Sequence, residues 1–303
     1  MRALQFAEYG GSDVLHVAEA EEPHAGEGQI RVAVRAVAVN PIEWKIRSGA
    51  MQDFMPVELP HIPGSDVAGV VDEVGDGVSG VSAGDQVFGS AVGAGSAQYA
   101  VVHAWAPMPA DLGFAEAAGF VTAAETAVRG LDLLGVEAET TLVVNGAAGG
   151  VGSAVVQLAL HRGATVIGTA SPVNHDYLRS LGAEPVTYGD GLVERVRDRA
   201  PDGVDVAFDV AGHGAAPALI ELVGRPEDVV TIADYEAGRL GVQVTSGSDG
   251  RSWQALALAA ELFEQGRFTL PVAQAFPLAD GAAAHRISQD GHVRGKLVLL
   301  VDH

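Results

Sequence analysis

The stretch that decides the fold is TLVVNGAAGGVGSAVVQLALHRGATVIGTA, residues 141–170. It opens with a short β-branched strand, Thr141–Asn145, and continues through a turn of small residues that ends at Gly152. The pattern then predicts an amphipathic helix over Ser153–Arg162 and a second strand over Thr165–Thr169. A strand, a turn, a helix and a strand in this order form a βαβ unit, whose two strands lie parallel in one sheet.

The small residues of the turn fit a dinucleotide-binding fingerprint. They let the backbone approach a pyrophosphate, and the N-terminus of the following helix offers unpaired N–H groups and a positive dipole end. Ala147 stands where the usual G-x-G-x-x-G has its first glycine. A glycine-rich turn alone is weak evidence, but its place between a strand and a helix favours binding over a plain turn. The candidate cofactor contacts are Ala147, Gly149, Gly150, Val151 and Gly152.

The end of the second strand favours NADPH over NADH. NAD sites usually carry a carboxylate about 20 residues after the turn, where it holds the ribose 2′-hydroxyl. Residues 169–171 are Thr-Ala-Ser, without an acid that would repel a 2′-phosphate, although no Arg or Lys follows before Arg179. Four polar residues are expected near the phosphate, and each fits an ordinary surface position equally well: Ser171, Asn174, His175 and Tyr188.

The rest of the chain divides into a β-rich first third and an α/β remainder. Strands are expected over Ile30–Val39 and Val67–Val74, whereas a helical pattern begins at Glu116 and runs to Leu134. Further short apolar strands follow at Val204–Val210, Val229–Ala233 and Leu297–Val301. Strands that alternate with helices predict a doubly wound parallel sheet, so the fold class is α/β.

Composition excludes several kinds of partner and chemistry. The net charge of −21, from 18 basic and 39 acidic residues, repels nucleic-acid phosphates. Apolar runs are interrupted and the N-terminus lacks a signal-peptide pattern, so we expect no membrane segment and a cytoplasmic location. Cysteine is absent, which rules out disulfides, thiolate nucleophiles and cysteine-ligated zinc.

Several motifs along the chain resemble the medium-chain dehydrogenase/reductase superfamily, in particular its quinone oxidoreductase, zeta-crystallin-like and enone reductase branch. The motifs are Asn40–Gly49, Ile62–Gly69, Gly84–Gly89, Thr122-Ala123, Ala147–Gly152, Phe276–Asp280 and Gly295–Leu299. The resemblance implies a GroES-like catalytic domain over residues 1–115, completed by residues 267–303. It also implies a Rossmann domain over residues 116–266 and a homodimer.

The same resemblance argues against zinc. In the alcohol-dehydrogenase branch a cysteine lies near the position of Asn40, and a His-Glu pair follows the glycine that matches Gly64. This chain has Ser65 and Asp66 there, and His61 lies upstream of the matching position. We therefore predict no metal site.

The resemblance implies that Asn40 and Lys45 lie beside the nicotinamide pocket and that Thr122 faces the nicotinamide end of the cofactor. Lys45 could polarise a carbonyl or relay a proton, or it could pair with a carboxylate or cover apolar surface with its stem. Asn40 could also act structurally in a turn before Pro41. Three further candidate cofactor contacts are Ala211, Arg294 and Lys296.

The leading hypothesis is an NADPH-dependent, zinc-free reductase of quinones or α,β-unsaturated carbonyl compounds. Two alternatives stay open: an enoyl reductase dedicated to one biosynthetic pathway, and a non-catalytic NADPH-binding structural or sensor protein. Residues Gly80–Gly84 match the G-x-S-x-G pattern of serine hydrolases. That motif needs a strand, a turn and a helix, but here it lies among β-turn residues, so we interpret it as a chance match.

Overall fold

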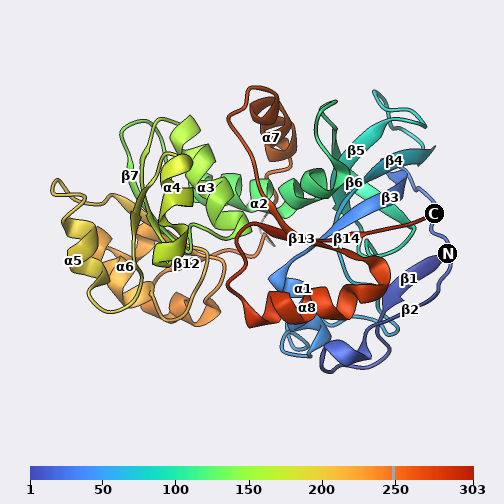
Figure 1. Cartoon of the computed structure of the whole chain (residues 1–303), viewed down its shortest axis with the longest axis horizontal. Helices are drawn as coiled ribbons and strands as arrows, with labels where there is room; N and C mark the ends of the chain where they lie inside the picture. Colours follow the sequence, from blue (N-terminus) through green and yellow to red (C-terminus); the bar gives the residue numbers. More distant parts are fainter. Residues whose placement is uncertain (248–249) are drawn as a thin grey trace. The chain divides into compact units, whose positions relative to one another are not determined.

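The computed structural model describes residues 1–247 and 250–303 and divides into two compact units (Figure 1). Unit 1 contains residues 1–122, 256–266 and 270–303, and unit 2 contains residues 123–255 and 267–269. The borders fall inside helix α2 (Phe114–Leu133) and helix α7 (Gln254–Glu264). The domain limits expected from the sequence, at residues 115 and 266, stay a prediction.

The core of unit 1 is a six-stranded sheet in the order β13-β14-β3-β4-β5-β6. Strand β3 pairs with β6 through residues 30–33 and with β14 through residues 36–39, so this long strand closes the sheet on itself. Every second residue of its first half is buried, which explains the alternating pattern of the sequence. The strands are β3 (Ile30–Val39), β4 (Asp66–Val74), β5 (Gln86–Ala91), β6 (Tyr99–Pro107), β13 (Val272–Pro277) and β14 (Lys296–Leu300).

Helices α1 (Pro41–Arg47) and α8 (Gly281–Asp290) and a small hairpin accompany the sheet of unit 1. Helix α1 follows β3 directly and packs against α8. The Glu43 side chain accepts a hydrogen bond from the backbone N–H of Asn40 at 3.2 Å, which satisfies a donor at the start of α1. Strands β1 (Arg2–Gln5) and β2 (His16–Glu19) pair antiparallel.

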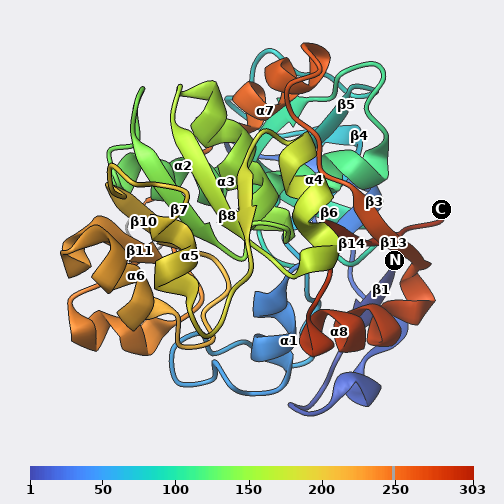
Figure 2. The same ribbon diagram turned by 60° about the vertical axis from the view of Figure 1, so that its left-hand side comes forward.

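Unit 2 contains a six-stranded sheet in the order β12-β11-β10-β7-β8-β9, in which every described pairing is parallel (Figure 2). The chain builds β7, β8 and β9 in one direction and then returns to build β10, β11 and β12 on the other side of β7. The strand order therefore reverses between β7 and β10, where doubly wound sheets bind ligands. The strands are β7 (Thr141–Asn145), β8 (Thr165–Thr169), β9 (Glu184–Val186), β10 (Val206–Asp209), β11 (Val229–Thr231) and β12 (Gln243–Val244).

The connecting helices of unit 2 pack on the strands that they join. Helix α3 contacts β7 and β8, and α6 contacts β10 and β11. The helix expected from Ser153 instead begins at Gly150, because Gly149 is still extended and the first helical turn lies within the small residues of the turn. The helices are α3 (Gly150–His161), α4 (His175–Ser180), α5 (Leu192–Arg197) and α6 (Ala216–Val223). Among the described residues, no helix combines the length and apolar character needed to cross a bilayer.

Candidate dinucleotide site and catalytic cluster

The glycine turn follows β7 at the point where the strand order reverses. Gly146 has a φ of +84°, a backbone conformation that favours glycine. Its N–H donates to Thr169 Oγ1 at 3.0 Å, and the N–H of Ala147 donates to the Thr169 carbonyl at 3.0 Å. Helix α3 then begins, and the N–H groups of its first turn lack partners within the helix, as in any α-helix. These features fit a pyrophosphate.

Close contacts explain the small residues of this turn. A Cβ added to Gly152 would lie 2.2 Å from the Gly146 carbonyl oxygen and 2.7 Å from Ala147 Cα. A Cβ on Gly149 would meet nothing nearer than 3.6 Å, which leaves space where a phosphate can approach. Ala147 is accommodated because its neighbour on β8 is Gly168, whose added Cβ would lie 2.8 Å from the Ala147 methyl. An alanine at the first fingerprint position therefore fits this fold.

Three of the four residues expected around a 2′-phosphate follow the end of β8. Ala170 is buried, and its carbonyl lies 3.3 Å from the His175 ring nitrogen Nε2. Asn174 Nδ2 donates to Ser171 Oγ at 3.3 Å, and His175 is the first residue of α4. Tyr188 follows β9 and is half exposed.

Of the three further candidates, Ala211 lies beside the glycine turn, since a Cβ on Gly146 would approach its methyl to 2.6 Å. Arg294 and Lys296 lie at the start of β14 in unit 1, where Arg294 is exposed and Lys296 is buried. Contact of these residues with a cofactor stays a prediction.

Unit 1 holds a buried polar cluster centred on Asp66. The Asp66 carboxylate accepts hydrogen bonds from Asn40 Nδ2 at 2.8 Å and from Ser65 Oγ at 3.0 Å. Thr122 donates to the same carboxylate twice, from its backbone N–H at 3.1 Å and from its hydroxyl at 2.6 Å. Because the Thr122 hydroxyl donates a hydrogen bond to Asp66, its oxygen can accept a hydrogen bond from another donor.

Lys296 closes this cluster. Its ammonium donates to Asn40 Oδ1 at 2.6 Å and lies 3.9 Å from Asp66 Oδ2. Burial lowers the pKa of Lys296, while Asp66 and Glu43 oppose that shift. The Asn40 amide accepts from Lys296 at Oδ1 and donates to Asp66 from Nδ2, and these two hydrogen bonds fix its orientation.

A second buried pair lies between α1 and α8. Burial, assisted by Asp66, raises the pKa of Glu43 to about 8, against the hydrogen bonds from Asn40 and the charge of Lys296. Burial also lowers the pKa of His285 to about 4, with a smaller contribution from Arg47. The two side chains face each other, with His285 Nε2 3.8 Å from Glu43 Oε2. Both are therefore uncharged near neutral pH.

This pair predicts a pH dependence of stability. In the folded chain Glu43 keeps its proton to about pH 8, whereas its ordinary pKa is 4.5. Its contribution to the free energy of unfolding is therefore complete below pH 4.5 and is lost as the pH rises. The contribution of His285 is complete above its ordinary pKa of 6.5 and is lost toward pH 4. Between pH 6.5 and 8 only the Glu43 contribution changes, by about 2 kcal/mol.

The check is urea unfolding of wild type and Glu43→Gln at pH 6.5 and at pH 8. We expect the fall in unfolding free energy over this interval to be smaller in the variant by about that amount. An equal fall in both proteins would contradict the assigned protonation of Glu43.

Lys45 does not belong to the Asp66 cluster. It is partly buried on α1, and its ammonium lies 5.9 Å from the centre of the Trp44 ring. The structure thus brings Asn40 and Thr122 together through Asp66. Of the two lysines predicted as site residues, it places Lys296 with them.

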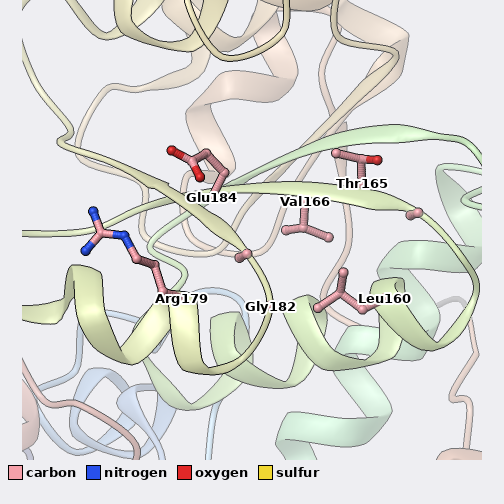
Figure 3. A pocket seen from close by; sticks show the side chains of 8 residues that line it. Leu160, Thr165, Val166, Arg179, Gly182 and Glu184 are labelled. Carbon is pink, nitrogen blue, oxygen red and sulfur yellow. The ribbon is translucent and has the colours of Figure 1, made fainter.

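A separate cavity of about 400 Å³ lies at the opposite end of β8 (Figure 3). It is lined by Leu160, Ala164, Thr165, Val166, Arg179, Gly182, Ala183 and Glu184. Thr165 and Val166 are the first residues of β8, whereas the glycine turn lies at the carboxyl ends of the strands. None of the candidate cofactor residues lines this cavity.

Comparisons with known proteins agree with this architecture. Residues 26–128 match the family model of the alcohol dehydrogenase GroES-like domain, and residues 181–299 match that of zinc-binding dehydrogenases. Quinone oxidoreductase from Mus musculus is 32% identical over 330 residues, which cover 99% of this chain and 98% of the mouse protein. The chain belongs to the medium-chain dehydrogenase/reductase superfamily.

Other members of this superfamily are similar over different shares of their length. The 2-methylene-furan-3-one reductase of Solanum lycopersicum is 36% identical over 82% of this chain, and the chain spans 66% of that protein. Spectinabilin polyketide synthase system protein NorB of Streptomyces orinoci is 34% identical over 96% of this chain, which spans 14% of it. The solved structure of Escherichia coli quinone oxidoreductase complexed with NADPH superimposes with a TM-score of 0.85 at 26% identity, covering 99% and 100% of the two chains.

Two buried residues of this medium-chain fold escaped sequence reasoning. Asp66 entered only as a mismatch to a zinc ligand, yet it is the centre of the cluster. Glu43 was not singled out as a candidate and lies within the motif Asn40–Gly49. The available signal was their position, since both lie within motifs that carry the family resemblance.

Proposed function

We propose that the chain reduces quinones or α,β-unsaturated carbonyl compounds with NADPH and without zinc. The observation that carries the proposal is the Asp66 cluster, a fixed set of hydrogen-bonding groups that includes Asn40 and Thr122. It belongs to a chain whose other unit carries a dinucleotide turn. In such a reaction negative charge develops on a carbonyl oxygen, and fixed polar groups are the usual means of stabilising it.

The donor chemistry of the cluster supports a metal-free reaction. Both polar atoms of the Asn40 amide are engaged, and the ammonium of Lys296 lies 3.9 Å from Asp66. A divalent cation would have to displace this ammonium and would find an amide and a hydroxyl where zinc prefers nitrogen and sulfur ligands. Within residues 1–247 and 250–303, no group of three or more His, Cys, Asp or Glu side chains is arranged so that it could hold a metal ion.

The residues in the reductase have separate roles in this proposal. A bound dihydronicotinamide supplies a hydride. Thr122 presents an acceptor oxygen that suits the carboxamide of the nicotinamide, and the Asn40 amide is held still beside it by Asp66 and Lys296. Lys45 is the proposed donor to the carbonyl oxygen of the substrate.

Lys45→Met is expected to lower enone or quinone turnover at least about tenfold while NADPH affinity is retained, because the variant loses a charged donor and keeps the stem. Steady-state kinetics with a fluorescence titration of NADPH measure both quantities. Wild-type turnover in this variant would remove Lys45 from the mechanism.

The strand end at Ala170 supports NADPH as the cofactor. Ala170→Asp is expected to shift preference toward NADH by about tenfold in the ratio of specificity constants, because a carboxylate repels a 2′-phosphate and accepts from a 2′-hydroxyl. Ala170→Asn is the matched variant, of nearly equal size without the charge. A ratio that stays at the wild-type value in Ala170→Asp would mean that the 2′-phosphate lies elsewhere.

A single-turnover experiment separates the proposal from its alternatives. The NADPH-loaded protein is mixed in a stopped-flow instrument with a panel of quinones and small enones, and NADPH absorbance is followed. We expect oxidation by several members of the panel. Oxidation by none would favour a sensor protein, or an enoyl reductase that accepts one dedicated substrate.

A further inference from the structure

Four buried polar side chains at the carboxyl ends of adjacent strands in unit 2 form one chain of hydrogen bonds. They are Thr169 of β8, Asn145 of β7, Asp209 of β10 and Thr231 of β11. Thr169 Oγ1 donates to Asn145 Oδ1 at 2.8 Å, and Asn145 Nδ2 donates to Asp209 Oδ1 at 2.8 Å. From the other side, Thr231 Oγ1 donates to Asp209 Oδ2 at 2.9 Å. The chain of bonds thus converges on Asp209.

The Asp209 carboxylate is fully buried and is surrounded by neutral donors. Besides Asn145 and Thr231, the backbone N–H groups of Ala211 and Gly212 donate to Oδ1 at 3.2 and 2.8 Å. No ion pair in the described part of the chain includes Asp209. Four donors directed at two oxygens are the arrangement that an ionised carboxylate takes. Its negative charge therefore has hydrogen bonds but no cation opposite it.

The place of Asp209 in the sheet relates this charge to one half of the cofactor. A sheet of this order binds a dinucleotide across the strand ends, with one nucleotide on each half. The glycine turn follows β7, so the half made by β7, β8 and β9 takes the adenine nucleotide and the other half takes the nicotinamide nucleotide. Asp209 is the last residue of β10, the first strand of that second half.

We propose that Asp209 is a fixed negative charge that favours the oxidised over the reduced nicotinamide. This inference rests on the proposed NADPH-dependent function. When NADPH transfers a hydride, which is a proton with two electrons, to the quinone or enone, its ring gains one positive charge. No bond to Asp209 forms or breaks, and its carboxylate attracts the charged ring more than the neutral one. Bound NADPH is consequently a stronger hydride donor than NADPH in water.

The test compares the dissociation constants of NADPH and NADP⁺ in wild type and Asp209→Asn, by calorimetry without substrate. Asparagine keeps the oxygen that accepts the three bonds at Oδ1 and alters only the contact with Thr231, whose Oγ1 already accepts from the N–H groups of Ala233 and Asp234. We expect the ratio Kd(NADP⁺)/Kd(NADPH) to rise at least about fivefold.

Asp205→Asn is the matched control. Asp205 immediately precedes β10, at its amino end, is exposed, and accepts from the Thr141 N–H at 2.7 Å. The substitution removes the same charge from the far end of the same strand, so the ratio should stay at the wild-type value.

A second variant should change the ratio of dissociation constants in the opposite direction. It also replaces the first test if Asp209→Asn does not fold. Thr231→Val removes the hydroxyl that donates to Asp209 and accepts from the N–H groups of Ala233 and Asp234, and it keeps the charge, so the same ratio should fall below wild type. Equal weakening of both cofactors in Asp209→Asn, or an unchanged ratio in Thr231→Val, would overturn the inference while the proposed function stands. Failure of the wild type to bind either cofactor would overturn both.

Discussion

Gly152→Val is expected to abolish dinucleotide binding and to leave unit 1 folded. The new Cβ would lie 2.2 Å from a backbone oxygen and 2.7 Å from a backbone carbon of the turn, and neither atom can rotate away as a side chain can. The first turn of α3 must therefore move off the residues that receive the pyrophosphate. We expect the Kd for NADPH, measured by fluorescence titration, to rise at least about 100-fold.

Gly238→Ala is the control for this variant. Its added methyl would meet only the Val244 side chain, at 3.3 Å, in the same unit. It should bind NADPH as the wild type does, and circular dichroism should report equal helix content in both variants. Wild-type affinity in Gly152→Val would contradict the placement of the cofactor at this turn.

Lys296→Met is the second variant with a large expected effect. It removes the cation beside Asp66 and frees the Asn40 oxygen, so a buried carboxylate loses its counter-charge. We expect unit 1 to lose about 3 kcal/mol of stability and turnover to fall at least about 100-fold. Urea unfolding and single-turnover kinetics measure the two effects.

The variant also distinguishes two roles of Lys296. If it positions Asn40, the NADPH affinity stays near wild type while the rate falls; if it is the cofactor contact expected from the sequence, the Kd rises instead. Asp66→Asn combined with Lys296→Met removes both charges, and the double variant should be destabilised less than the sum of the single variants. Additive losses would mean that the two charges do not interact.

Local patterns predicted the parts of the fold that depend on local sequence. Strands β3, β7 and β8 begin and end at the residues that the sequence predicted, because each is a β-branched run bounded by turn residues. The start of α3 was placed three residues late, because periodicity cannot show that glycines already form the first helical turn.

The candidate site was less accessible to sequence reasoning. Lys296 and Asn40 are 256 positions apart, and only the pairing of β14 with β3 brings their strands together. From the sequence Asp209 is an ordinary acid at the end of a strand, because two of its donors, Asn145 and Thr231, come from other strands. The sequence identified the turn and the residues Asn40 and Thr122 as candidates, and the fold revealed the carboxylates around them.

The most direct test of metal-free reduction is a single turnover with product analysis. NADPH-loaded protein, treated with a strong chelator and dialysed, is mixed with an enone, and both NADPH loss and the saturated ketone are quantified. We predict one ketone formed for each NADPH oxidised, at the same rate before and after chelation. Loss of activity on chelation with recovery on adding zinc would contradict this account.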